Sequence, residues 1–113
     1  MMESKKLLEL IVETLDNGKA HDIAIADFEQ THPLCDYFVI CDAPSLRQVN
    51  ALAEQVLYKT SEAGFDLRNE ERSTDSPWIL LDFNDVIVHI FLSEARDHYQ
   101  LDKLYQDYLN ERV

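Results

Sequence analysis

The chain has 113 residues, of which 46% are hydrophobic and 10% aromatic, and this length and composition predict one folded globular domain over residues 1–113 rather than a disordered protein. Its formal net charge is −12, from 22 acidic side chains against 10 lysines and arginines, which disfavours direct binding to a nucleic acid. Such a charge favours a basic protein as partner, or serves solubility alone. The two glycines, Gly18 and Gly64, exclude every glycine-rich phosphate-binding loop.

Membrane association and secretion are not expected. The longest uninterrupted apolar run covers residues 37–41, far short of the roughly 20 residues that span a bilayer. Glu3 lies among the first basic residues and Glu9 interrupts the apolar stretch after them, which is unlike a signal peptide. Cys35 and Cys41 fall in one extended segment, about 20 Å apart and too far for a disulfide, and two free thiols suit a reducing cytoplasm.

The first third of the chain predicts a helix and two strands. Apolar residues from Leu7 to Leu15 recur on one helical face, with Ser4 as the expected cap and residues 17–18 as the stop. Residues 22–28 alternate as a short strand, and residues 36–42 predict a second, buried strand.

A second helix and a third strand are expected next. Ser45 and Gln48 have the spacing of a capping box, apolar residues follow at helical spacing, and Gly64 stands where a C-terminal cap is expected. Residues 65–67 alternate as a brief strand, whereas residues 69–77 are polar and predict a loop.

The clearest local pattern is a hairpin. Residues 78–83 and 86–92 are both rich in β-forming side chains, and the Asn-Asp pair at 84–85 fits a two-residue turn of type I′. Ser93 is then expected to cap a last helix with one apolar side: Leu101, Leu104, Tyr105, Tyr108 and Leu109. The order α-β-β-α-β-β-β-α predicts an α/β domain with one mixed sheet of about five strands and flanking helices.

Pairing across this turn divides the hairpin into two faces. One face is wholly apolar and is expected to meet the core: Ile79, Leu81, Phe83, Val86, Val88 and Ile90. The other mixes large apolar groups with an acid and an imidazole: Trp78, Leu80, Asp82, Ile87, His89 and Phe91. Either further helices cover this second face and its polar groups are hydrogen-bonded, or it is partly exposed and docks a protein partner.

Catalytic and metal-binding patterns are weak. Asp82 and Asp85 flank a tight turn, where aspartates usually set the conformation of the backbone. His89 with Asp82 lacks the third ligand that a metal ion needs. We therefore expect no catalytic residue, no metal and no cofactor.

Three separated motifs in the chain are CDYFVIC at residues 35–41, SLRQV at 45–49 and WILLDFNDVIVHIF at 78–91. In this order they resemble the ribosomal silencing factor family (RsfS, also called Iojap or YbeB). The family's final helix is matched by Arg96, Tyr99, Leu101 and Leu104, and the similarity runs from about Leu7 to Tyr105. The family usually has a glycine in the hairpin turn where this chain has Asn84.

The resemblance implies a nucleotidyltransferase-like fold and a translation repressor rather than an enzyme. Members of the family bind the large ribosomal subunit through its fourteenth ribosomal protein, L-fourteen, and sterically block joining of the small subunit. Free members are often homodimers, and organelle relatives act in ribosome biogenesis. The resemblance implies partner contacts at Trp78, Leu80, Asp82, His89 and Tyr99. Asp36 and Tyr37 also match the family and rank lower, because a structural role explains them as well.

Two other functions stay open at this point. One is a nucleotidyltransferase-like enzyme, although the chain has neither the Gly-Ser pair nor the Asp-x-Asp motif that such enzymes use around magnesium. The other is an assembly or oligomerisation module with a different protein partner. Co-purification of large ribosomal subunits would separate the silencing factor from both.

Overall fold

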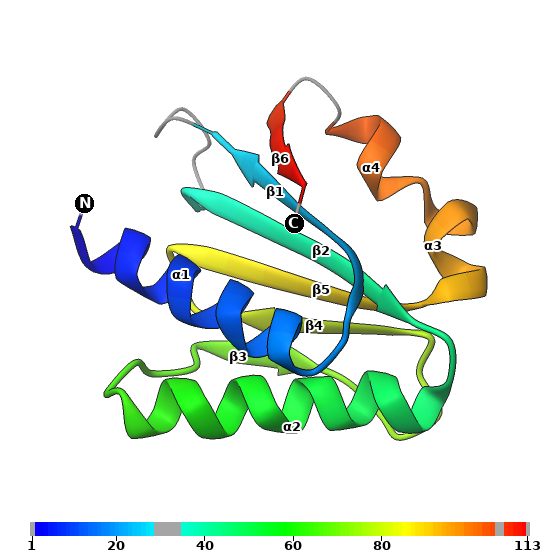
Figure 1. Cartoon of the computed structure of the whole chain (residues 1–113), viewed down its shortest axis with the longest axis horizontal. Helices are drawn as coiled ribbons and strands as arrows, with labels where there is room; N and C mark the ends of the chain where they lie inside the picture. Colours follow the sequence, from blue (N-terminus) through cyan, green and yellow to red (C-terminus); the bar gives the residue numbers. More distant parts are fainter. Residues whose placement is uncertain (1, 29–34, 106–107, 113) are drawn as a thin grey trace.

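A computed structural model describes residues 2–28, 35–105 and 108–112. Its helices are α1 (Met2–Asn17), α2 (Leu46–Glu62), α3 (Ser93–Tyr99) and α4 (Leu101–Leu104). Its strands are β1 (His21–Asp27), β2 (Tyr37–Ala43), β3 (Asn69–Glu71), β4 (Trp78–Asp82), β5 (Val86–Leu92) and β6 (Leu109–Arg112). They form one sheet in the order β3-β4-β5-β2-β1-β6, in which β2 and β5 run parallel and the other neighbours antiparallel (Figure 1). The predicted α/β class with a mixed sheet is confirmed.

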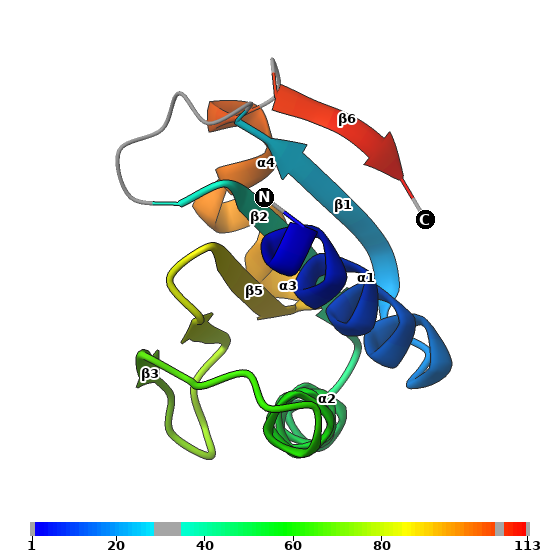
Figure 2. The same ribbon diagram turned by 90° about the vertical axis from the view of Figure 1, so that its left-hand side faces the viewer.

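Helices cover both faces of this sheet. α1 and α2 lie on one side, and α3 with α4 lies on the other (Figure 2). The wholly apolar hairpin face lies under α1 and α2 as predicted, and all six of its residues are buried there. A smaller cluster on the other side of the sheet includes Phe28, Phe38 and Phe91. The predicted register is also confirmed, because Trp78 lies opposite Phe91.

The sequence signals at the helix ends are confirmed for α2 and only in part for α1. The Ser45 hydroxyl accepts a hydrogen bond from the backbone N–H of Gln48 at 3.2 Å, as a capping residue does. Gly64 follows α2 with φ +85°, the left-handed conformation that commonly ends a helix. α1 stops at Asn17 as expected, but it starts at Met2, so Ser4 lies inside the helix and does not cap it.

The edge strands differ from the sequence-based expectation. The third strand is β3, within the segment predicted as a loop, and residues 65–67 form no strand. All three β3 residues are exposed, so no alternation of apolar and polar side chains marks this strand in the sequence. β6, which pairs with β1, is a sixth strand in a region predicted as helix.

The hairpin turn is of a different type from the one predicted. A type I′ turn needs positive φ at both central residues, but of the two only Asn84 has it, at 77°. The N–H of Asp85 donates to the carbonyl of Phe83 at 3.0 Å, which makes Asn84 the centre of a γ-turn. Asp82 accepts from the N–H of Asn84 at 2.8 Å, and Arg68 donates to the Asn84 side chain at 2.8 Å. These two bonds hold a backbone conformation that asparagine adopts more readily than most residues.

The last helix is shorter than predicted and is broken. Gln100 lies between α3 and α4 in the left-handed conformation, with φ 54°, and Leu109 belongs to β6. Ser93 does not cap α3, because its hydroxyl donates to Asp42 at 2.5 Å while Leu92 occupies the cap position. Across the described parts of the chain, no helix is both long enough and apolar enough to cross a membrane.

Candidate protein-docking site

Trp78 belongs to an aromatic cluster between the sheet and α3. Its indole stacks on Phe91, its partner across β4 and β5, with ring centroids 5.0 Å apart. Tyr99 of α3 packs on the same indole at 4.7 Å and on Phe91 at 5.8 Å. Phe91 is fully buried, Trp78 is half-buried and Tyr99 is 44% exposed, so the cluster extends from the core to the surface. A graded aromatic cluster of this kind is suited to anchoring a protein partner.

His89 lies beneath this cluster and is only 3% exposed. Nε1 of Trp78 donates a hydrogen bond to Nδ1 of His89 at 3.1 Å, so the proton of the neutral imidazole resides on Nε2. The ring of Phe38 packs on the imidazole at 4.7 Å, and burial lowers the pKa of His89 to about 4. The imidazole is therefore neutral near pH 7, and it acts on the surface by orienting the Trp78 indole.

Carboxylates at the edge of the sheet flank the cluster. Residues that face each other across an antiparallel ladder lie on the same face, and Glu71 of β3 lies opposite Leu80. Glu71 is therefore an exposed acid on the face that carries Trp78 and Leu80. Asp82 shares that face and is half-buried, with one oxygen engaged by the backbone of the turn. The sequence does not reveal Glu71, because its segment lacks the alternation of a strand.

Leu104 extends the apolar part of this surface. It is 72% exposed and lines a shallow hollow together with Tyr99, Gln100 and Lys103. The sequence pattern predicts Leu104 on the buried side of one long helix, but the break at Gln100 leaves it in solvent. We define the Trp78 surface as Trp78, Leu80, Tyr99 and Leu104 with the acids Glu71 and Asp82.

Asp36 and Tyr37 lie elsewhere. Their backbone N–H groups donate to the carbonyl of Asp85 at 2.8 and 3.1 Å, at the turn end of the hairpin and far from Trp78. The Tyr37 side chain packs against the core cluster beneath α1 and α2, on the opposite face of the sheet. Their positions favour a structural role for both residues.

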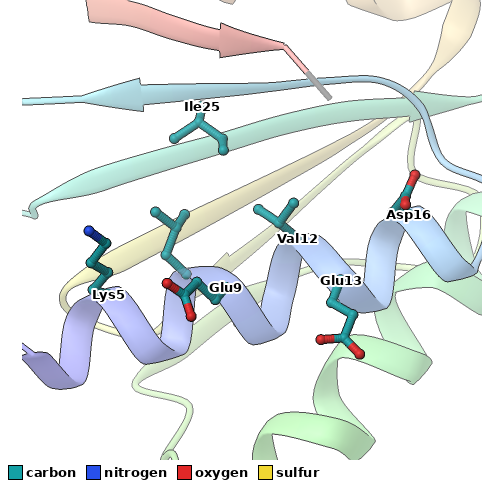
Figure 3. Close-up of a pocket in the computed structure, with 7 residues that line it drawn as sticks. Lys5, Glu9, Val12, Glu13, Asp16 and Ile25 are labelled. Atoms are coloured by element: carbon teal, nitrogen blue, oxygen red, sulfur yellow. The ribbon is translucent and has the colours of Figure 1, made fainter.

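A second hollow, of about 400 Å³, lies between α1 and β1 (Figure 3). Its apolar floor is Leu8, Val12 and Ile25, and its rim is Lys5, Glu9, Glu13 and Asp16. Leu8 and Ile25 are already buried, so a ligand placed there would remove little apolar area from water. This acidic groove lies on the α1 side of the sheet, opposite the face that carries the Trp78 surface.

The described residues contain neither a cluster of metal ligands nor an activated thiol. Within residues 2–28, 35–105 and 108–112, no three His, Cys, Asp or Glu side chains are arranged as metal ligands. Burial raises the pKa of Cys35 and of Cys41 to about 12, so both thiols stay protonated and unreactive.

Comparisons with known proteins identify relatives over nearly the whole chain. The model of the family "Ribosomal silencing factor during starvation" matches residues 1–113. A ribosomal silencing factor of Bacillus subtilis is 34% identical over 106 residues, which cover 94% of this chain and 90% of the relative. One of Haemophilus influenzae is 38% identical over 99 residues, covering 88% and 97%. A crystal structure of a Chromobacterium violaceum protein matches with a TM-score of 0.84 at 34% identity, covering 90% of this chain and 85% of that one.

Proposed function

The chain belongs to the ribosomal silencing factor family, and we propose that it binds the large ribosomal subunit through ribosomal protein L-fourteen and thereby blocks joining of the small subunit. The observation that carries this proposal is the Trp78 surface, where half-buried and exposed aromatic groups meet carboxylates. Repression of translation is then steric: the domain covers a surface that the small subunit needs, with no catalysis and no cofactor.

A protein receptor suits the charge of the chain better than ribosomal RNA does. The net charge of −12 repels phosphate groups, whereas ribosomal proteins that bind RNA are generally basic. Glu71 and Asp82 would meet basic side chains of L-fourteen, which favours the correct orientation more than it raises affinity. Trp78, Leu80, Tyr99 and Leu104 would supply the apolar contact that holds the complex together.

The test uses purified L-fourteen and isolated ribosomal subunits. We expect direct binding to L-fourteen, no binding to protein-free ribosomal RNA, and inhibition of subunit joining when the chain is added before the small subunit. Binding should be only moderately sensitive to salt, because few ion pairs contribute. Tight binding to naked RNA, or failure to bind L-fourteen, would overturn the proposal. Release of pyrophosphate from nucleotides with magnesium would instead support the enzyme alternative.

Charge-removing variants locate the contact. Asp82→Asn removes the charge but keeps an oxygen that can accept the hydrogen bond of the turn. Glu71→Gln removes the charge of the exposed acid on the same face of the sheet. We expect each to slow association with L-fourteen several-fold at low salt. Glu9→Gln and Glu13→Gln in the α1 groove remove the same charge on the other side of the sheet (Figure 3) and should change association much less. Equal effects at both places would show that net charge alone drives binding.

We further propose that the protein works in the cytoplasm and that the free protein is a homodimer. The exposed part of the Trp78 surface supports self-association, because an apolar surface without a partner tends to pair with another copy.

A further inference from the structure

The corner between α3 and α4 is held by a buried arginine. Arg96, in α3, is 6% exposed, and its Nε and Nη2 donate to the two carboxylate oxygens of Asp102 in α4 at 2.9 and 2.7 Å. Its Nη1 donates to Asp42 of β2 at 2.8 Å and to the backbone carbonyl of Asp22 of β1 at 2.7 Å. One side chain thus joins both sides of the corner to two strands of the sheet.

The two helices at this corner need such support. α3 has seven residues and α4 has four, and isolated helices of this length are not stable in water. The cap position of α3, Leu92, makes no side-chain hydrogen bond, and Gln100 between the helices is left-handed without being a glycine. The path of the chain from α3 into α4 therefore depends on contacts with the sheet.

The geometry of the network is specific to arginine. Burial alone would lower the pKa of Arg96, but its hydrogen bonds to Asp102 and Asp42 outweigh burial and raise this pKa, so the guanidinium stays charged. The other carboxylate oxygen of Asp42 accepts a hydrogen bond from the Ser93 hydroxyl at 2.5 Å, so both oxygens of Asp42 are engaged. A lysine carries its three donors on one atom, so it cannot form two parallel bonds to Asp102 and also reach both strands.

From this arrangement we propose that Arg96 is a positioning residue for docking: it fixes the α3–α4 corner so that Tyr99 and Leu104 complete the Trp78 surface. Tyr99 follows Arg96 by three residues, and its ring rests on Trp78 at 4.7 Å. Leu104 follows Asp102 by two residues in the same short helix. Because Arg96 is buried, it acts through these neighbours and not by touching the partner. The inference rests on the proposed binding to L-fourteen.

The test compares Arg96→Lys and Asp102→Asn with the unaltered protein. Trp78 is the only tryptophan of the chain, so its fluorescence quenching by acrylamide reports whether Tyr99 still covers the indole. We expect affinity for purified L-fourteen to fall about ten-fold or more and quenching to rise in both variants. The matched control is Arg72→Lys, at an arginine paired with Glu54 of α2 at 2.7 Å, which should change neither quantity. Unchanged affinity and quenching in the Arg96 and Asp102 variants would overturn the inference.

A double-mutant cycle with Tyr99→Ala separates positioning from a general loss of stability. If Arg96 acts through Tyr99, the effect of Arg96→Lys on affinity should shrink to about three-fold or less once Tyr99 is absent. Fully additive effects would overturn the inference, and so would loss of cooperative unfolding in both Arg96→Lys and Asp102→Asn. If the unaltered protein does not bind L-fourteen, the proposed function fails, and the quenching measurement still decides whether Arg96 positions Tyr99.

Discussion

The indole N–H of Trp78 donates to Nδ1 of His89 at 3.1 Å, from a half-buried residue of β4 to a buried residue of β5. The acceptor is the lone pair that a protonated imidazole lacks, so the bond exists only while His89 is neutral. Nε2 of the same ring is buried and has no hydrogen-bond partner among the described residues. The orientation of Trp78 on the proposed docking surface is therefore coupled to the protonation state of a buried histidine.

Acid should destabilise the fold through His89. The pKa of His89 is lowered by burial from 6.5 to about 4, so the unfolded state binds a proton more readily than the folded state does. This contribution to stability is complete above about pH 6.5 and is lost as the pH falls toward 4. At about 1.4 kcal/mol per pKa unit, it amounts to about 3 kcal/mol, which thermal unfolding across this pH range would measure.

The control for this prediction is His89→Gln. The glutamine side chain offers a neutral carbonyl that can accept from the indole, and it does not titrate. Aspartates and glutamates also titrate near pH 4, so the difference between the two proteins isolates the histidine. Parallel stability curves for both proteins between pH 6.5 and 4 would show that His89 is not the group responsible.

Local patterns were sufficient to predict most of the fold. The helix cap at Ser45, the stop at Gly64 and the alternation of the hairpin depend on neighbours in sequence, and the structure confirms them. The division of the hairpin into two faces was also correct, because a side chain's face follows from register alone. Tyr99 joined Trp78 and His89 only through the family resemblance, and in the structure the rings of both His89 and Tyr99 contact the Trp78 indole.

The expectations that failed depended on contacts between residues that helical or strand periodicity does not connect. Ser93 has the residue type of a helix cap, yet it bonds to Asp42, which is 51 positions earlier in the chain. The apolar pattern of the last helix continues past Gln100, but Gln100 adopts the left-handed conformation and Asp102, beyond the break, accepts a hydrogen bond from Arg96. Glu71 joins the proposed surface only because a wholly exposed segment pairs with β4. None of these partners follows from helical or strand periodicity.

Leu104→Ala should weaken docking without affecting stability. Because Leu104 is 72% exposed, its truncation removes few internal contacts, and the unfolding free energy should change by less than about 0.5 kcal/mol. If Leu104 contributes to the surface that binds L-fourteen, affinity should fall about five-fold, or about 1 kcal/mol. The control is Tyr58→Ala on α2, which removes an aromatic side chain that is 62% exposed. Equal losses for the two variants would remove Leu104 from the docking surface.

The free protein should be a homodimer that Leu104→Asp and Tyr99→Ala weaken. Both side chains are exposed, and pairing of two copies would remove them from water. Light scattering over about 1 to 100 μM should give twice the mass of the chain at the upper end and a shift toward monomer in the variants. A monomer throughout this range would contradict the prediction, and an unaffected dimer in both variants would place its interface elsewhere.

Trp78→Ala should abolish silencing through loss of binding. Truncation of a central interface tryptophan typically removes about 2–4 kcal/mol of binding free energy, or roughly 30- to 1000-fold in affinity. The free energy of unfolding will also fall, because the indole stacks on Phe91 and donates a hydrogen bond to His89. For a half-buried side chain we expect a loss of about 2 kcal/mol, less than the roughly 3–5 kcal/mol typical of a fully buried one. Thermal unfolding and binding to large subunits, measured on one preparation, separate the two effects.

Trp78→Phe distinguishes an anchor from a packing residue. Phenylalanine can still stack on Phe91 and Tyr99 but has no N–H to donate to His89, so most of the stability should return. Affinity for large subunits should recover only in part, because the smaller ring covers less of the partner. If Trp78→Ala unfolds at room temperature while Trp78→Phe binds normally, the indole serves the fold and not the interface. If Trp78→Ala binds normally and still blocks subunit joining, Trp78 does not belong to the docking site.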